Sequence, residues 1–296
     1  MQIIVLGAAA GGGLPQWNCG CRNCADARVG RLPVMTQSSL AVSVDGVSWV
    51  VLNASPDIGV QLQRTPQLHP RSLRDTPIAA VVLTNGDIDH IAGLLTLREK
   101  TAFTLYTTSA GGEIVETNSV FNVLDPALVA RQTVHLDQGF EPVSGLTVTP
   151  FAVPGKVALF LEDADALDLE AVGEQTVGLM LEAGGKRVAY VPGCAAIPDW
   201  LRKRLEGIDL LLFDGTVWEN DDMPRSGTGQ KTGARMGHVA LNGAGGSLAG
   251  FADLPARKVL VHINNTNPVL QPDSPERAAV QTAGWEIAHD GMAITP

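Results

Sequence analysis

The residues best suited to chemistry lie in a short polar loop between an apolar strand and a helix. Ala79–Leu83 is a β-branched, apolar run typical of a buried strand, and Ile91–Leu97 has the pattern of a helix start. Asp89 and His90 stand between them, at the strand end where α/β proteins usually build their sites. Carboxylate and imidazole groups bind divalent metals. The alternative is structural: Asp89 caps the helix and His90 is its partner.

Three cysteines form the most specific short motif, Cys19-Gly-Cys21-Arg-Asn-Cys24. Thiolates this close together can hold one zinc ion in a closed, tetrahedral structural site whose fourth ligand comes from elsewhere in the chain. A cluster of free thiols without a metal is the alternative. The candidates for the fourth zinc ligand are Cys194, Asn265 and His289.

Polar residues also follow other apolar strands. Asp214 comes directly after the run Leu210–Phe213, and His262 comes directly after Lys258–Val261. His238 is expected to open a helix, which it could simply cap, and for His262 the alternative is a buried structural role. The remaining histidines have no such context and are expected at the surface or in packing contacts: His69, His135 and His289.

Composition narrows the class of protein. The 296 residues carry 21 basic and 31 acidic side chains, a net charge of −10, which argues against a nucleic-acid partner. The start of the chain lacks the basic region of a signal peptide, and no apolar run reaches the roughly 18 residues of a membrane span. We therefore expect a cytoplasmic protein, in which four cysteines are ligands or free thiols rather than disulfides.

The predicted elements suit an α/β fold in which two sheets lie between helices, an αββα sandwich. We expect a single domain over residues 1–296, with the cysteine motif as an N-terminal zinc element. Gly7–Gly13 is expected to form a tight turn beneath the site, and Asp163–Glu174 a solvated surface segment. The predicted strands are Gln2–Leu6, Ser39–Ser43, Trp49–Asn53, Ala79–Leu83, Phe103–Tyr106, Leu146–Phe151, Thr176–Leu181, Arg187–Val191, Leu210–Phe213, Lys258–Val261 and Glu286–Ala288. The predicted helices are Asp57–Arg64, Ile91–Lys100, Pro198–Glu206, Leu241–Phe251 and Ser274–Thr282.

The order of these motifs resembles that of the metallo-β-lactamase superfamily. The H-x-H-x-D-H loop of that superfamily would fall on Asn85-Gly-Asp87-Ile-Asp89-His90. Four further segments make the chain similar to the PqqB-like family of pyrroloquinoline quinone (PQQ) biosynthesis proteins. They are GGLP with CxCxxC, FDGTVWEND, GHVALNG, and HINNTNP followed by SPER.

The departures from the superfamily pattern imply a change of chemistry. Superfamily hydrolases bind two zinc ions, but Asn85 and Asp87 replace the first two histidines, Pro154-Gly155 falls where a third would lie, and Cys194 replaces the bridging aspartate. The ligands of the second ion survive as Asp89, His90 and His262. Two histidines and one carboxylate form the facial triad that suits oxygen-activating Fe(II).

The resemblance implies an iron-dependent oxygenase that uses O₂ to hydroxylate a tyrosine-derived intermediate of the PQQ precursor. Asp214 and His238 would orient ligands or transfer protons, beside a structural zinc on Cys19, Cys21 and Cys24. The competing hypothesis is a carrier that moves PQQ or its precursor to the periplasm, and a third is residual hydrolysis. We expect no nucleic-acid or membrane partner, and a homodimer is left open.

Overall fold

Two seven-stranded sheets form the centre of the molecule, in a computed structural model that describes residues 1–163 and 168–296. In spatial order, the first sheet contains β14 (Ala293–Ile294), β1 (Gln2–Gly7), β2 (Ser39–Ser43), β3 (Trp49–Leu52), β4 (Ile78–Val82), β5 (Phe103–Thr107) and β6 (Val129–Thr133). The second contains β13 (Trp285–Ile287), β12 (Arg257–Val261), β11 (Leu210–Asp214), β10 (Lys186–Val191), β9 (Ala171–Ala183), β8 (Leu146–Gly155) and β7 (Phe140–Val143).

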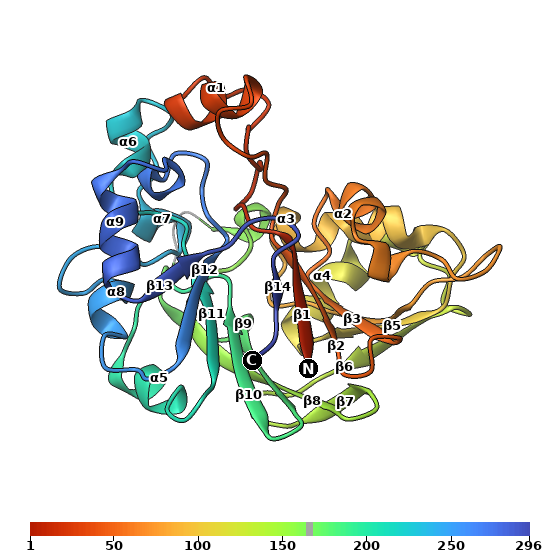
Figure 1. Ribbon diagram of the computed structural model, residues 1–296. Helices are drawn as coiled ribbons and strands as arrows, with labels where there is room; N and C mark the ends of the chain where they lie inside the picture. The colour runs from red at the N-terminus through yellow and green to blue at the C-terminus, as the bar shows by residue number, and fades with distance from the viewer. Residues whose placement is uncertain (164–167) are drawn as a thin grey trace.

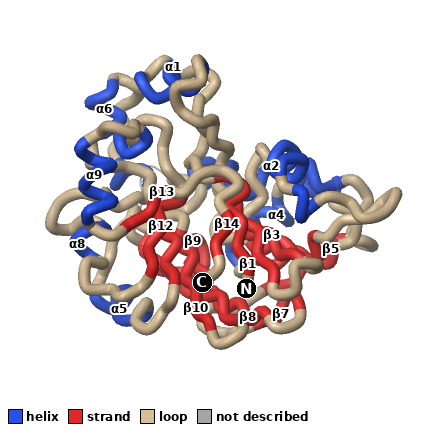
Figure 2. Tube along the Cα trace, viewed as in Figure 1, coloured by secondary structure: helices blue, strands red, loops and turns tan. Residues whose placement is uncertain are grey.

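Helices cover the outer flanks of both sheets, which confirms the predicted αββα sandwich (Figures 1 and 2). On the side of the first sheet these are α2 (Ile58–Arg64), α3 (Ile88–Ile91) and α4 (Ser109–Thr117). On the other side lie α1 (Arg22–Arg28), α5 (Asp199–Arg204), α6 (Asp222–Ser226), α7 (Gly233–Met236), α8 (Ser247–Gly250) and α9 (Pro275–Thr282). Short 3₁₀ turns link these elements: η1 (Pro66–Leu68), η2 (Ala92–Arg98), η3 (Ser119–Val123), η4 (Leu159–Leu161) and η5 (Pro268–Leu270).

The apolar strands are buried on both faces, and alternate side chains belong to different cores. In β1, Ile3 and Val5 belong to the core that the two sheets share, whereas Ile4 and Leu6 pack into the core under α2. This two-residue alternation follows from the pleat, and burial on both faces explains why the strand is a continuous apolar run. The two ends of the chain meet in this sheet, where β1 pairs with β14.

Parallel pairing brings the functional strand ends together. β3, β4, β5 and β6 run parallel in the first sheet, and β10, β11, β12 and β13 run parallel in the second. The carboxyl ends of neighbouring parallel strands lie at one edge of a sheet, where loops can project side chains into a shared space. Two backbone links join the sheets near this edge: Val177 N donates to Thr84 O at 2.9 Å, and Asn85 forms a bridge with Thr176.

Several predicted boundaries are wrong, for identifiable reasons. The helix predicted over Leu241–Phe251 is reduced to α8, because the backbone at Gly243 has a φ of 89°, which a right-handed helix cannot contain. The helix predicted over Ile91–Lys100 is mainly the 3₁₀ turn η2, in which Gly93 packs against the backbone of Ser55. Within the segment Asp163–Glu174, residues 171–174 open β9, and residues 164–167 lie outside the described residues.

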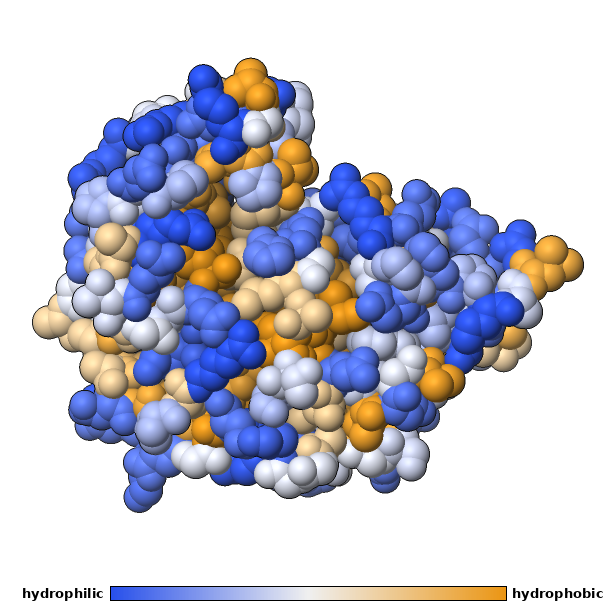
Figure 3. Space-filling model, viewed as in Figure 1, coloured by the Kyte–Doolittle hydropathy of each residue, from blue (hydrophilic) through white to orange (hydrophobic). Residues whose placement is uncertain are grey.

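The surface is hollowed between the part of the molecule that carries α1 and the part that carries α2 (Figure 3). Among the described residues, no helix is both long and apolar enough to cross a membrane.

Candidate metal centre

The loop after β4 places Asp89 and His90 on the short helix α3. Asp87 stands at the N-cap position of α3 with an extended backbone and no side-chain cap hydrogen bond, and Asp89 lies inside the first turn. The alternative in which Asp89 caps the helix is therefore wrong. The Asp89 carboxylate instead reaches His262, which follows β12 in the other sheet.

The structure brings together the three residues predicted as iron ligands. Asp89, His90 and His262 each offer a ligand atom, and these atoms lie within 4.8 Å of one another. Asp89 Oδ2 lies 3.1 Å from His262 Nε2 and 3.8 Å from His90 Nε2. Both imidazoles are buried, at the inner end of a cleft of about 250 Å³.

Hydrogen bonds fix which nitrogen of each imidazole faces the cluster. His90 Nδ1 donates to Asn85 Oδ1 at 2.7 Å, and that oxygen also accepts from Asp87 N at 3.0 Å. His262 Nδ1 donates at 2.8 Å to Thr216 Oγ1, whose own hydrogen goes to Asp214 Oδ1 at 2.6 Å. With both Nδ1 atoms donating, each Nε2 is left to bind a metal.

This donor set fits a divalent metal. His90 Nε2 is buried and has no hydrogen-bond partner among the described residues, and an orphaned buried nitrogen beside a carboxylate is costly unless something binds it. A bound cation would also replace the proton that His262 Nε2 shares with Asp89. Two histidines and one carboxylate leave coordination positions open for substrate or O₂.

The charges of the site favour the metal-binding forms of Asp89 and His90. Burial opposes ionisation of Asp89, but its interactions with the two imidazoles of His90 and His262 hold the pKa of Asp89 well below its usual range. Burial lowers the pKa of His90 to about 4, so His90 is neutral at neutral pH. The pKa of His262 is raised despite burial, because it donates a hydrogen bond to Asp89. A cation must therefore displace a proton from His262.

A second group, Asp214, His238 and His262, shares one histidine with the first. Asp214 is fully buried, and Cys194 N, Thr216 N, Thr216 Oγ1 and His238 Nδ1 all donate to its oxygens, at 3.1, 2.9, 2.6 and 2.6 Å. Because its lone pairs are occupied, Asp214 is better placed to orient His238 than to bind a metal. His238 does not open a helix as predicted. It follows α7, which ends at Gly237 in a left-handed conformation.

Sequence reasoning missed two residues that hold the ligands. Asn85 was interpreted as a lost ligand, and Thr216 was noted only as part of the segment after β11. The structure shows both accepting from an imidazole Nδ1. The glycine loop does approach the site, as predicted: a Cβ on Gly11 would lie 3.5 Å from the Asp89 carboxylate.

The three cysteines of the N-terminal motif converge as well. Their sulfur atoms lie within 4.8 Å of one another, and Asn265 Nδ2 lies 3.2, 3.6 and 3.3 Å from the sulfurs of Cys19, Cys21 and Cys24. Rotating the side-chain amide of Asn265 by 180° would direct Oδ1 toward the three sulfurs instead. Asn265 is therefore the best placed of the three candidate fourth ligands. Cys194 instead donates its thiol to Ala196 O at 3.0 Å, and the exposed His289 contacts Asp290 O.

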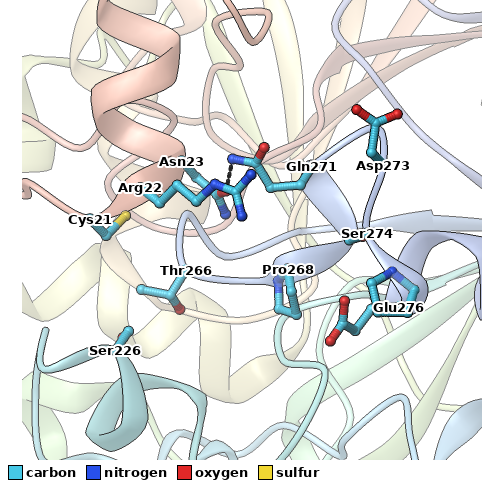
Figure 4. A pocket seen from close by; sticks show the side chains of 11 residues that line it. Cys21, Arg22, Asn23, Ser226, Thr266, Pro268, Gln271, Asp273, Ser274 and Glu276 are labelled. Carbon is cyan, nitrogen blue, oxygen red and sulfur yellow. Dashed lines mark hydrogen bonds between the residues drawn. The ribbon is translucent and has the colours of Figure 1, made fainter.

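The cysteine element is tied to the segment that carries His262. Asn23 Nδ2 donates to Asn265 O and Asn267 O, both at 2.9 Å, and Gln271 Nε2 donates to Asn23 Oδ1 at 2.7 Å. Figure 4 shows Cys21, Asn23 and Gln271 along one side of a cleft of about 430 Å³. A metal on the cysteines would therefore stabilise the loop that follows β12.

Replacement of Cys21 by serine is expected to remove a tightly bound zinc ion that Asp89→Ala retains. The thiolate cluster supplies most of the binding free energy, which is roughly 10 kcal/mol or more for structural zinc. Metal analysis of the two purified variants checks this expectation. Zinc content unchanged in Cys21→Ser would remove the structural-zinc assignment.

Replacement of Asn85 by alanine is expected to weaken metal binding at Asp89, His90 and His262 by about 10–100-fold, as losing a ligand's hydrogen-bond partner typically does. The reason is that His90 Nδ1 loses its acceptor, so its ring orientation is no longer fixed. Competition with a chelator measures the affinity. Asn85→Asp keeps an acceptor oxygen and should retain most of it. Equal affinities in wild type and Asn85→Ala would contradict the positioning role.

Comparisons with known proteins agree with this geometry. Residues 48–263 match the beta-lactamase superfamily domain. Coenzyme PQQ synthesis protein B of Methylorubrum populi is 58% identical over 298 residues, covering 99% of each chain. The protein of the same name from Rhizobium meliloti is 60% identical over 297 residues, covering 99% of this chain and 97% of its own. The chain belongs to the coenzyme PQQ synthesis protein B family.

Solved structures support the same assignment. Zinc-bound PqqB from Methylobacterium extorquens superimposes with a TM-score of 0.98 at 57% identity, covering all of both chains. A diphosphatase of the PhnP family matches with a TM-score of 0.70 at 22% identity, over 99% of this chain and 96% of its own, and shows the shared fold alone. The fold and the family support a metal-dependent enzyme of PQQ biosynthesis.

Proposed function

We propose that this protein is a non-haem Fe(II)-dependent oxygenase that hydroxylates a tyrosine-derived intermediate in PQQ synthesis. The observation that carries the proposal is the set of Asp89, His90 and His262, which line an open cleft, together with the buried His90 Nε2, which has no hydrogen-bond partner among the described residues. Fe(II) bound by these three residues would supply the activation of O₂.

The remaining residues of the cleft suit a phenol. His238 lines the cleft, and its Nδ1 donates to Asp214 at 2.6 Å, which leaves Nε2 free to accept the phenol proton. The buried Asp214 carboxylate would stabilise the imidazolium that forms, as in other carboxylate–histidine pairs. Leu159 and Met236 provide apolar surface for an aromatic ring.

The loop after β4 favours oxygenation over hydrolysis. Asn85, at the first histidine position, directs its Oδ1 to His90 and Asp87 N rather than into the cleft. Asp87 stands at the second histidine position of the superfamily loop, where burial and the charge of Asp89 raise its pKa. Metal-dependent hydrolysis often uses two metal ions that share a hydroxide. Here the first of those two ions lacks ligands.

Protein loaded anaerobically with Fe(II) tests the proposal. On exposure to O₂ with L-tyrosine as the phenol and ascorbate as the two-electron reductant, it should form a catechol product, with the second oxygen atom of O₂ released as water. Zinc-loaded protein should form none, because zinc has no redox chemistry. If neither the Fe(II)-loaded nor the zinc-loaded protein forms a catechol on exposure to O₂, and the protein binds PQQ stoichiometrically, a carrier function would replace the oxygenase proposal.

No useful phosphodiesterase or β-lactamase activity is expected with any divalent metal, because the first-ion ligands are absent at Asn85 and Asp87. Assays with bis(4-nitrophenyl) phosphate and a chromogenic cephalosporin measure this. Robust turnover of either substrate that His262→Asn abolishes would contradict the oxygenase proposal.

A further inference from the structure

Cations gather at the cleft of an otherwise acidic protein. The chain carries a net charge of −10, yet Lys156, Lys231 and Arg235 line the same cleft as the proposed iron ligands. Lys231 precedes α7, Arg235 lies within it, and Lys156 directly follows β8. Two carboxylates, Asp87 and Asp89, also line the cleft, and Asp89 is the proposed metal ligand.

The Glu162 carboxylate forms ion pairs with two of the three cations, Arg235 and Lys156. It accepts from Arg235 Nη1 and Nη2 at 3.1 and 2.7 Å and lies 2.9 Å from Lys156 Nζ. The Glu162 and Lys156 side chains are only 8% and 9% exposed, and these contacts hold the pKa of Glu162 at about 2. Glu162 and Lys156 are buried and Arg235 is partly exposed. Because the three groups form one network, Arg235 and Lys156 have a structural task that joins η4 to α7.

Lys231 is different from these two residues. It is exposed, it lines the cleft, and no carboxylate among the described residues pairs with it. A lysine that lines a site and has no carboxylate partner among the described residues is placed to meet an anion that enters. Lys231 shares the cleft with an apolar side chain, Leu159, which is 53% exposed.

We propose that Lys231 binds a carboxylate of the substrate and thereby selects an anionic aromatic acid over a neutral phenol. This inference rests on the proposed function, in which a phenol lies between Leu159 and the metal ligands. The cationic side of the cleft would receive the carboxylate, and the apolar and metal-binding sides would receive the ring. The one excess positive charge on the network of Lys156, Glu162 and Arg235 adds to the attraction.

Binding to zinc-loaded protein tests this inference without oxygen chemistry. The probes are 3-(4-hydroxyphenyl)propanoate and 4-ethylphenol, which share the phenol ring but differ in the carboxylate, and calorimetry measures both affinities. Wild type should bind the acid at least about tenfold more tightly, the scale of one charged hydrogen bond. Lys231→Gln should lose most of this preference and bind 4-ethylphenol as wild type does. Because Lys231 is exposed, the variant should fold normally.

Lys203→Gln is the matched control. Lys203 is exposed on α5, lines none of the described metal cleft, and has no carboxylate partner among the described residues, so this variant makes the same charge change elsewhere. It should keep the full preference. Equal affinity of wild type for the two probes, no measurable binding of either probe, or an unchanged preference in Lys231→Gln would overturn the inference. If the Fe(II)-loaded protein shows no O₂-dependent hydroxylation while the zinc-loaded protein keeps this preference, the result would support Lys231 and refute the proposed function.

Discussion

Replacing Asp89 by alanine or His262 by asparagine is expected to abolish O₂-dependent turnover and to weaken Fe(II) binding. Each substitution removes one of three ligands, and even a change in a ligand's hydrogen-bond partner costs about 10–100-fold in metal affinity. Asparagine is the better choice at His262 because φ is 56° there, in the left-handed region that asparagine tolerates. Anaerobic Fe(II) titration and product analysis measure the two effects.

His69→Asn is the matched control for the histidine substitution. His69 is exposed and its ring contacts only Gln63 O among the described residues, so the same chemical change there should leave iron binding and turnover unchanged. The thermal midpoints of all three variants should lie near that of the wild type, because Asp89 lies on the short helix α3 and His262 in the loop after β12, outside both apolar cores. Wild-type turnover in either ligand variant would refute the assignment of the three residues.

Replacing His238 by alanine should lower turnover by about 10²–10⁴-fold, the usual contribution of a positioned acid or base. Iron affinity should stay within a few-fold of wild type, because His238 belongs to the proton-transfer pair with Asp214 and not to the three proposed ligands. Single-turnover kinetics and Fe(II) titration separate the two quantities.

Added imidazole provides the control for this variant. If His238 accepts the phenol proton, imidazole should restore part of the activity of His238→Ala at a pH where imidazole is neutral. Loss of iron binding together with turnover would instead make His238 a metal ligand, and wild-type turnover would remove it from the reaction.

The alternation of apolar residues was enough to predict the main strands of the sandwich. β1 and β4 are apolar on both faces, so their burial follows from their composition. β6 (Val129–Thr133) was missed because it is a polar strand at the sheet edge, with one buried and four exposed residues. β14 was missed because it has only two residues, held in place by pairing with β1 rather than by its own pattern.

The sequence was sufficient to predict which residues form the site. It was not sufficient to predict the hydrogen bonds that orient them. Asp89 and His262 were noted because each follows an apolar strand, and their grouping as metal ligands came from the resemblance to the metallo-β-lactamase superfamily. The roles of Asn85 and Thr216 could not be predicted in this way, because a hydrogen bond to an imidazole depends on the ring orientation. Lys156 and Lys231 are 75 positions apart and meet only in the folded cleft.

The most direct test of the proposed function is the origin of the oxygen atom in the product. Fe(II)-loaded protein would be given a tyrosine-like phenol, ascorbate as the two-electron reductant and ¹⁸O₂ in ordinary water, and the product would be examined by mass spectrometry. The oxygenase proposal predicts one ¹⁸O atom in the hydroxylated ring, with no such product from Asp89→Ala. A product that contains only oxygen from water, or no incorporation with any metal, would contradict it and leave the carrier hypothesis as the better account.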